Sequence, residues 1–167
     1  MQRPSKDKYY IDIALAVSKR STCLRRHYGA VIVKDDVIVA TGYNGSPRGE
    51  ENCCDCGVCK RENAERYSGY EDCPAVHAEQ NALLAVDRAH SQGATLYLAC
   101  EGYSLECGGS RLKCEDDCSL FEDDCHNRRL VLREDYNPRP CSLCARMLKN
   151  AGITRVVNRR GEVDIWA

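Results

Sequence analysis

Gly29-Ala-Val-Ile-Val-Lys34 and Val37-Ile-Val-Ala-Thr41 are two runs rich in β-branched residues, separated only by Asp35-Asp36. Runs of this length and composition are typical of strands, and a two-residue connection between them is typical of a β-hairpin. Gly42-Tyr-Asn-Gly45-Ser-Pro47 then breaks the extended pattern. The stretch therefore predicts the antiparallel part of a sheet.

Helical patterns and further short strands surround this hairpin. The helical patterns cover Asp7 to Arg20, Ala75 to Ala89 and Cys141 to Ala151, and the strand patterns cover Ala94 to Ala99 and Ile153 to Val157. In the tail, the alternation of Val163, Ile165 and Trp166 indicates one short edge strand. Because helices connect the later strands, the order predicts an α/β sandwich with a mixed sheet.

Length and charge narrow the class of protein. The 167 residues are the size of one domain, and 24 basic residues nearly cancel 25 acidic ones, so charge does not indicate a nucleic-acid partner. A small anionic substrate remains open. The first residues are polar, and no apolar run approaches the roughly 18 residues of a membrane span. We expect a soluble, unprocessed, cytoplasmic protein with a single domain over residues 1–167.

Thirteen cysteines are many for this length, and their number is odd. Since no secretory signal is seen, metal-bound thiolates explain them better than a disulfide framework. Most lie in two polar stretches, Arg48 to Pro74 and Cys100 to Arg139. The second is too long for an ordinary connection, so we expect it to be functional, tied by a metal or mobile.

His77-Ala-Glu79 and Pro140-Cys141-Ser-Leu-Cys144 supply three metal ligands and one carboxylate. One imidazole and two thiolates leave the fourth position of a tetrahedral Zn²⁺ open, as in catalytic zinc sites. His77 and Glu79 fall in the first turns of one predicted helix, and the two cysteines at the start of another, so both pairs can face one cleft. The positive end of a helix favours the thiolate form.

His-x-Glu with Pro-Cys-x-x-Cys is the signature of the zinc-dependent deaminases. In the predicted mechanism, zinc lowers the pKa of a bound water, and the hydroxide attacks the amidine carbon of an aminopyrimidine. Glu79 carries the proton to the ring nitrogen and then to the leaving ammonia. Cys-x-x-Cys alone also marks structural zinc sites and redox pairs. A zinc-stabilised binding module without catalysis stays an alternative, which the presence of Glu79 disfavours.

Over most of residues 7–99 and 138–157 the chain resembles the deoxycytidylate (dCMP) deaminase family, within the zinc-dependent cytidine deaminase superfamily. Besides the zinc motifs, the resemblance rests on Arg20-Ser-Thr-Cys23, Gly29-Ala-Val-Ile-Val33, Gly42-Tyr-Asn-Gly45-Ser-Pro47-Arg-Gly49 and Asn52-Cys53-Cys54-Asp55. It implies a three-layer α/β/α sandwich and the conversion of dCMP to dUMP and ammonia for thymidylate synthesis. It also implies a homo-oligomer activated by dCTP and inhibited by dTTP.

The resemblance further implies roles for residues outside the zinc motifs. The expected substrate contacts are Asn44, Arg20, Ser21, Arg26 and Ala78. Cationic donors suit a monophosphate, although a solvated helix end explains each arginine equally well. Gly42, Tyr43 and Gly45 match the region linked to the allosteric nucleotide, with a plain turn as the alternative.

Additional zinc sites are predicted from the remaining cysteines. Some family members carry a second, structural zinc, and Cys23 and Cys53 match cysteines used there. The other ligands do not match, so we expect an all-thiolate site from Cys23, Cys53, Cys59 and Cys73.

An insertion of about residues 101–139 separates the chain from ordinary members of the family. Cys114, Cys118, Cys125 and His126 are the predicted ligands of a further zinc there, and a disordered acidic insertion is the alternative. Because the insertion adjoins the predicted cleft at both ends, it leaves the substrate open. Another cytosine nucleotide (dCTP or a modified cytidylate) and, less favoured, a base in nucleic acid are the alternatives to dCMP.

Overall fold

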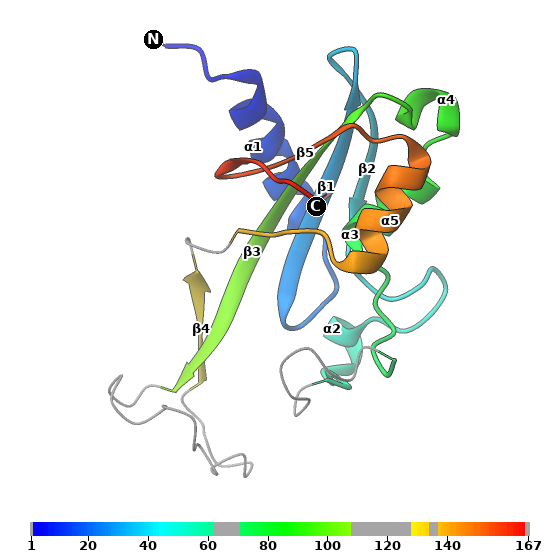
Figure 1. The fold of residues 1–167 in the computed structure, drawn as a ribbon. Coiled ribbons are helices and arrows are strands. Elements are labelled where there is room, and N and C mark those ends of the chain that lie inside the picture. Colours follow the sequence, from blue (N-terminus) through cyan, green and yellow to red (C-terminus); the bar gives the residue numbers. More distant parts are fainter. Residues whose placement is uncertain (1, 62–70, 108–127, 134–136, 166–167) are drawn as a thin grey trace.

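The computed structural model describes residues 2–61, 71–107, 128–133 and 137–165. Its centre is a mixed sheet in which the strands lie in the order β2 (Val37–Tyr43), β1 (Arg26–Lys34), β3 (Thr95–Cys107), β5 (Arg155–Asn158) and β6 (Gly161–Glu162) (Figure 1). A further strand, β4 (Arg128–Arg133), pairs with the far half of β3. Only β3 and β5 run parallel to each other; the other described pairs are antiparallel. The predicted mixed sheet is confirmed.

The predicted hairpin forms β1 (Arg26–Lys34) and β2 (Val37–Tyr43). Its two-residue turn places Asp35 at φ 49° and Asp36 at φ 67°. Two successive left-handed residues match the right-handed twist of the flanking strands, and Asp tolerates that conformation better than most residues. The hairpin is therefore encoded locally, by the turn as well as by the β-branched runs.

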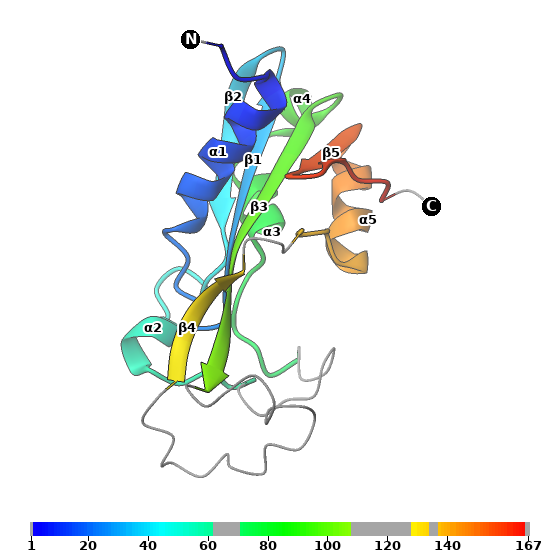
Figure 2. The same cartoon turned by 90° about the vertical axis from the view of Figure 1, so that its left-hand side faces the viewer.

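Helices cover both faces of the sheet, which gives three layers (Figure 2). On one face α1 (Lys6–Ser18) buries Tyr10, Ile11 and Ala14 against one set of alternating strand residues, Val31, Val33, Tyr97, Ala99 and Val157. On the other face α3 (Ala78–Leu84) and α5 (Ser142–Ala151) pack against the opposite set, which includes Ala30, Ile32, Leu96, Leu98 and Val156. Alternating side chains of one strand thus serve two separate cores.

The prediction of one helix from Ala75 to Ala89 is wrong at both ends. α3 begins only at Ala78, because the backbone of Val76 pairs with Gly45 as an isolated β-bridge and is therefore extended. After Leu84 the chain turns, and the Asp87 carboxylate accepts the backbone N–H of His90 and starts a separate short helix, α4 (Arg88–Ser91). A helical apolar pattern does not reveal either interruption.

The segment after the predicted strand Ala94–Ala99 is also more regular than expected. β3 runs from Thr95 to Cys107, and β4 (Arg128–Arg133) pairs with its far half, with Gly102 opposite Arg133. Cys100, expected to belong to the polar insertion, is instead buried in the sheet, and burial raises the pKa of its thiol to about 12. The expected zinc ligands Cys114, Cys118, Cys125 and His126 lie outside the described residues.

The C-terminal elements follow the prediction closely except at the edge. α5 ends at Gly152, which has φ 82°, and β5 (Arg155–Asn158) follows. The edge strand β6 is only Gly161–Glu162, ahead of the alternating tail. Val163 is buried and donates its backbone N–H to the Val156 carbonyl, so this residue of the tail packs into the core.

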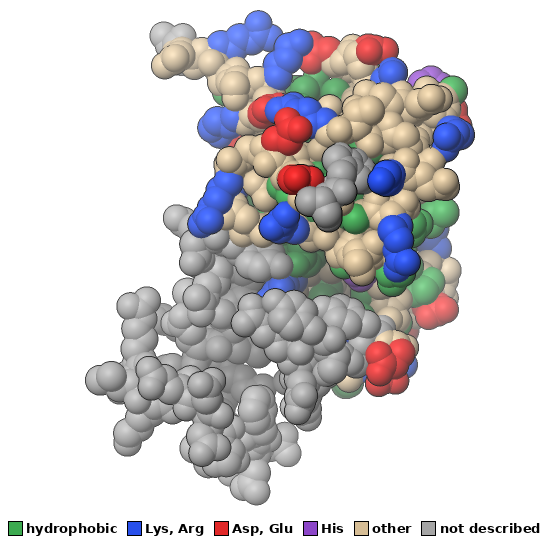
Figure 3. Space-filling view, in the orientation of Figure 1, with side chains coloured by type: hydrophobic (Ala, Val, Ile, Leu, Met, Phe, Trp, Pro, Cys, Tyr) green, Lys and Arg blue, Asp and Glu red, His purple; other side chains and the backbone are tan. Residues whose placement is uncertain are grey.

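The face of the molecule seen in Figure 3 shows no single dominant charge. In the view of Figure 3, basic and acidic side chains are interspersed over the described face. None of the helices in the described ranges is long and apolar enough to cross a lipid bilayer.

Candidate metal centre

Three ligand atoms meet where the starts of two helices face each other. His77 is the residue that caps α3, Cys141 caps α5, and Cys144 lies in the first turn of α5. One ligand atom from each residue lies within 4.8 Å of the other two. No other such group of three His, Cys, Asp or Glu residues occurs in the part of the chain that the structure describes. The structure thus brings together residues from two motifs more than sixty positions apart.

The spacing of these atoms fits a tetrahedral zinc ion. His77 Nδ1 lies 3.4 Å from Cys144 Sγ and 3.6 Å from Cys141 Sγ. Bonds of about 2.0 Å to nitrogen and 2.3 Å to sulfur place two ligand atoms of a tetrahedral zinc roughly 3.6 Å apart. The donor set, one imidazole and two sulfurs, is the one that zinc prefers.

Without a metal, one of the two sulfurs is held as a thiolate and the other as a thiol. The Cys144 thiol and then the His77 ring hold the pKa of Cys141 down at about 3. The same contact with Cys141, followed by burial, raises the pKa of Cys144 above its ordinary value. Two thiolates this close are thus not favoured together without a positive charge, and zinc supplies that charge.

Neighbouring backbone contacts hold each ligand in place. The Gln80 side-chain oxygen accepts the backbone N–H of His77 at 2.9 Å, and the Cys144 N–H points at Cys141 Sγ at 3.4 Å. Asn158, buried at the end of β5, donates its side-chain N–H to the Pro138 carbonyl at 3.0 Å. Sequence reasoning assigned no role to Gln80 or Asn158. Only Gln80 had a signal, since Gln three residues after a helix cap is typical of a capping box.

Glu79 lies beside the ligands and is 4% exposed. Burial raises the pKa of its carboxyl, while the His77 ring acts in the opposite direction. A carboxyl group whose pKa is raised by burial is suited to accept and return a proton near neutral pH. The expected proximity of Glu79 to the metal ligands is therefore present in the structure.

Asn44, an expected substrate contact, is buried and already bonded through its amide. Its Oδ1 accepts hydrogen bonds from the Tyr28 backbone N–H at 2.7 Å and the Ser21 hydroxyl at 2.7 Å. Its Nδ2 donates to the Arg26 carbonyl at 2.9 Å. The amide therefore joins the end of β2 to the start of β1, and a contact of Asn44 or Ser21 with substrate stays a prediction.

The other expected substrate contacts lie on or next to three different elements near the end of β2. Arg20 and Arg26 are exposed, just after α1 and at the start of β1, and Ala78 is fully buried at the start of α3. The Tyr43 carbonyl accepts a hydrogen bond from the Asn81 side chain at 2.7 Å. Their roles toward a nucleotide stay predictions.

The expected second zinc site is not preassembled like the first. Burial first, and then the nearby Cys23 sulfur, raises the pKa of Cys53, with smaller effects from Cys56 and Cys59. Cys53 and Cys56 lie on the short helix α2 (Cys53–Cys56), and the Cys54 N–H donates to the Thr22 carbonyl at 3.1 Å. Cys23, Cys56 and Cys59 are thus near enough to act on the Cys53 thiol, and a zinc site from Cys23, Cys53, Cys59 and Cys73 stays a prediction.

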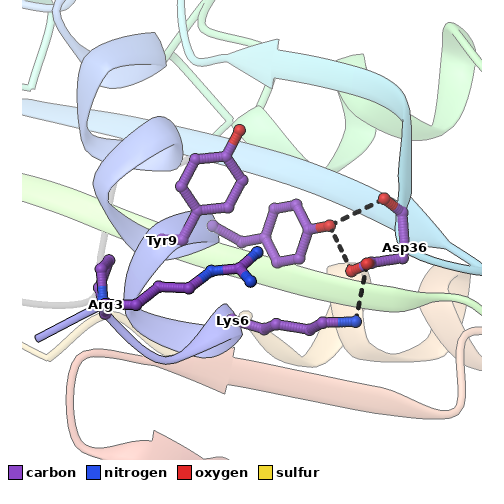
Figure 4. A pocket seen from close by; sticks show the side chains of 6 residues that line it. Arg3, Lys6, Tyr9 and Asp36 are labelled. Carbon is purple, nitrogen blue, oxygen red and sulfur yellow. Dashed lines mark hydrogen bonds and ion pairs between the residues drawn. The ribbon is translucent and has the colours of Figure 1, made fainter.

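A cavity of about 340 Å³ lies elsewhere, at the N-terminal end of α1 (Figure 4). Three of its polar side chains bond one another, since Lys6 pairs with Asp36 at 2.7 Å and the Tyr10 hydroxyl donates to the Asp36 carboxylate at 2.8 Å. Because α1 covers the opposite face of the sheet from α3, this cavity is separate from the metal centre.

Comparisons with known proteins match both the chain and its fold. A family model described as the cytidine and deoxycytidylate deaminase zinc-binding region matches residues 4–159. The deoxycytidylate deaminase of Mycobacterium phage D29 is 44% identical over 108 residues, which are 60% of this chain and 82% of that protein. That of Schizosaccharomyces pombe is 44% identical over 98 residues, but the chain spans only 30% of its length.

Among solved structures, the dCMP deaminase from cyanophage S-TIM5 in complex with dCMP and dUMP superposes with a TM-score of 0.55. The match covers 95% of this chain and 83% of that one at 24% identity. At this level of identity it shows a shared fold, and it confirms the predicted three-layer α/β/α architecture.

Proposed function

Since the chain belongs to the cytidine and deoxycytidylate deaminase zinc-binding family, we propose that it hydrolyses dCMP to dUMP and ammonia. In this reaction one water adds at the carbon that bears the amine, and one ammonia leaves. The observation that carries the proposal is the buried Glu79 carboxyl beside a His-Cys-Cys ligand set. Relatives named deoxycytidylate deaminases support dCMP as the substrate.

His77, Cys141 and Cys144 would hold the zinc ion. When bound, zinc supplies a water whose pKa is lowered toward neutrality, and three protein ligands leave a position open for that water. Gln80 fixes the backbone of His77, and the first turn of α5 orients the Cys141 sulfur, through the hydrogen bonds to the His77 backbone N–H and to Cys141 Sγ.

Glu79 moves the proton. It lies two residues from a zinc ligand, and its burial keeps the carboxyl from sharing its proton with bulk water. It takes the proton of the attacking water, passes it to the ring nitrogen of the pyrimidine and delivers one to the departing amine. The carboxylate returns to its starting form after each turnover.

Glu79→Gln tests this assignment, with ammonia release and zinc content measured on the same preparation. The amide keeps the size of the side chain but cannot accept the proton, so we expect zinc to be retained and the rate to fall by about 10²–10⁴-fold. Glu50→Gln, an exposed carboxylate, is the matched control and should leave both unchanged. Near-normal turnover of Glu79→Gln would overturn the role of Glu79.

A panel of cytosine nucleotides tests the substrate. We expect ammonia from dCMP in preference to CMP, dCTP and 5-substituted dCMP. Ammonia release from dCTP alone, or from a modified nucleotide alone, would support the proposed reaction but show that dCMP is not the substrate. Failure to release ammonia from any of them, with zinc bound, would overturn the reaction itself.

We further infer that the protein acts as a single-domain, cytoplasmic homo-oligomer that responds to dCTP and dTTP. Leu84 and Leu143, 78% and 59% exposed on the two helices that carry the metal centre, support an assembly that covers them. Light scattering with and without each nucleotide, alongside the rate at low dCMP, tests both points. A monomer whose rate neither nucleotide changes would contradict them.

A further inference from the structure

Two glycines at neighbouring positions of the hairpin let a helix lie directly on each face of the sheet. Gly29 in β1 faces Tyr43, and Gly42 in β2 faces Ala30, so the two glycines are one register step apart. A Cβ atom on Gly29 would lie 2.0 Å from the Ala14 carbonyl oxygen of α1. A Cβ atom on Gly42 would lie 2.3 Å from the Ala78 carbonyl oxygen of α3.

The contact at Gly42 is made by backbone on both sides. The same Cβ would lie 2.4 Å from the Ala82 nitrogen, and real Cβ atoms essentially never approach another heavy atom within 3.0 Å. No side-chain rotation can relieve such a contact, so α3 itself must move away from β2. Ala78 and Ala82, both fully buried, show how closely the helix is seated.

The position of α3 matters because its first turn belongs to the metal centre. His77 precedes its first residue, and Glu79 is its second. The partner ligands Cys141 and Cys144 lie at the start of α5, which packs against α3. The close contact at Gly42 involves α3 and not α5. A shift of α3 therefore changes the distance from His77 and Glu79 to the two sulfurs.

A second backbone contact connects the chain just after β2 to the residue before His77. Gly45 and Val76 exchange two backbone hydrogen bonds, at 3.2 and 2.8 Å, immediately before His77. A Cβ on Gly45 would lie 2.4 Å from the Thr22 side-chain oxygen, so a side chain at position 45 fits only if Thr22 moves.

We propose that Gly42 and Gly45 are positioning residues for the metal centre: the absent side chains seat α3 and Val76 against the end of β2, and so place His77 and Glu79 opposite Cys141 and Cys144. The inference rests on the proposed deaminase function for its kinetic readout. It does not depend on that function for its metal readout.

Gly42→Ala compared with Gly29→Ala is the direct test. Both add one methyl group against helix backbone, so both should lower the free energy of unfolding in urea. Displacement of a catalytic group by about 1 Å can cost on the order of 10²-fold, so in Gly42→Ala we expect kcat per zinc-loaded molecule to fall 10–100-fold, with a much smaller change in KM. Gly29→Ala should keep kcat close to the wild type and change KM instead, because α1 carries no group of the metal centre but leads into the expected substrate contacts Arg20 and Ser21.

Equal kcat losses in the two variants, or a wild-type kcat in zinc-loaded Gly42→Ala, would overturn the proposal. If the wild-type protein releases no ammonia, the proposed function fails, and zinc affinity measured by competition with a chelator decides the inference instead. Weaker zinc binding in Gly42→Ala than in Gly29→Ala supports it, and equal affinities overturn it.

A rescue pair covers the case in which Gly42→Ala does not fold. In Gly45→Ala the new methyl group meets the Thr22 hydroxyl, which is fully buried and has no hydrogen-bond partner among the described residues. Removing that hydroxyl in Gly45→Ala/Thr22→Ala makes room for the methyl group. We expect lowered kcat and zinc affinity in the single variant and recovery of both in the double variant. No loss in the single variant, or no recovery in the double, would contradict the role of Gly45.

Discussion

The two cysteine-containing regions of this molecule differ in how their sulfurs are held. At the metal centre, Cys141 and Cys144 are at the start of α5, and His77 at the start of α3, with the ligand atoms at zinc-site distances. Around Cys53, the thiols come from a loop and from the four-residue helix α2, and no three of the described thiols there reach that spacing.

This difference shows what helix ends contribute to a metal site. A helix start fixes the backbone by hydrogen bonds and supplies free N–H groups and positive charge to a thiolate. The loop cysteines have fewer such constraints, so a metal would have to order them on binding. One region is therefore assembled in advance, whereas a zinc site in the other would form only on binding the ion.

Cys144→Ser should have the largest effect on the assembled centre. A hydroxyl is a poor zinc ligand compared with a thiolate, and the site loses one of its three ligands. We expect zinc to be lost and turnover to fall by more than about 10³-fold, measured by metal analysis and ammonia release. Cys54→Ser, at an exposed position, is the control. Retained zinc and turnover in Cys144→Ser would show that this region is not the catalytic centre.

Cys56→Ser and Cys73→Ser separate the two ligand sets for a second zinc. The pattern of thiols around Cys53 predicts that wild-type protein binds at least two zinc ions per chain and that Cys56→Ser binds one fewer. Loss of a structural zinc also removes folding energy, so thermal unfolding should shift downward with the metal count. One zinc per chain in the wild type would rule out a second site. Loss in Cys73→Ser alone would restore the ligand set expected from sequence.

Gln80→Ala should weaken the assembled centre without dismantling it. The variant leaves the His77 N–H without its partner, a hydrogen bond worth about 1 kcal/mol. We expect zinc affinity about tenfold weaker or less, measured against a chelator. Gln92→Ala, an exposed glutamine beyond α4, should bind zinc as tightly as the wild type does. An unchanged affinity in Gln80→Ala would mean that packing alone orients His77.

Asp7→Asn should have the smallest effect and leave both cysteine regions intact. The hydrogen bond from Arg155 is the largest cause that lowers the pKa of the Asp7 carboxyl, and Tyr97 donates a second hydrogen bond. Because the pKa of the Asp7 carboxyl is lower in the folded state, the ionised carboxyl stabilises the fold at pH values above its pKa in the unfolded chain. This contribution to stability is lost as the pH falls through the pKa in the folded state.

Because Asp7 and Arg155 are 40% and 35% exposed, solvent screens the pair, and we expect a loss of about 1 kcal/mol or less at pH 7. The difference between wild type and Asp7→Asn in urea unfolding should shrink below about pH 4. A difference that persists in acid would point to packing instead of charge.

Much of the fold was predictable because its signals are local. The hairpin with its Asp35-Asp36 turn, the helix that ends at Gly152 and the strand after it each depend on residues within one short window. Errors arose where a distant partner intervened. Val76 joins Gly45 instead of a helix, and β4 returns to extend the sheet along β3.

For the candidate site, the residue types in His77-Ala-Glu79 and Pro140-Cys141-Ser-Leu-Cys144 were enough to identify the zinc chemistry, because ligand preference is a property of the side chains themselves. Only the tertiary structure shows that Val76 pairs with Gly45 just before His77, that Gly42 lets α3 rest on β2, and that the Cys23 sulfur lies near Cys53. These relations depend on how closely separate segments pack, and backbone-to-backbone distances across a sheet are not encoded in any single stretch of sequence.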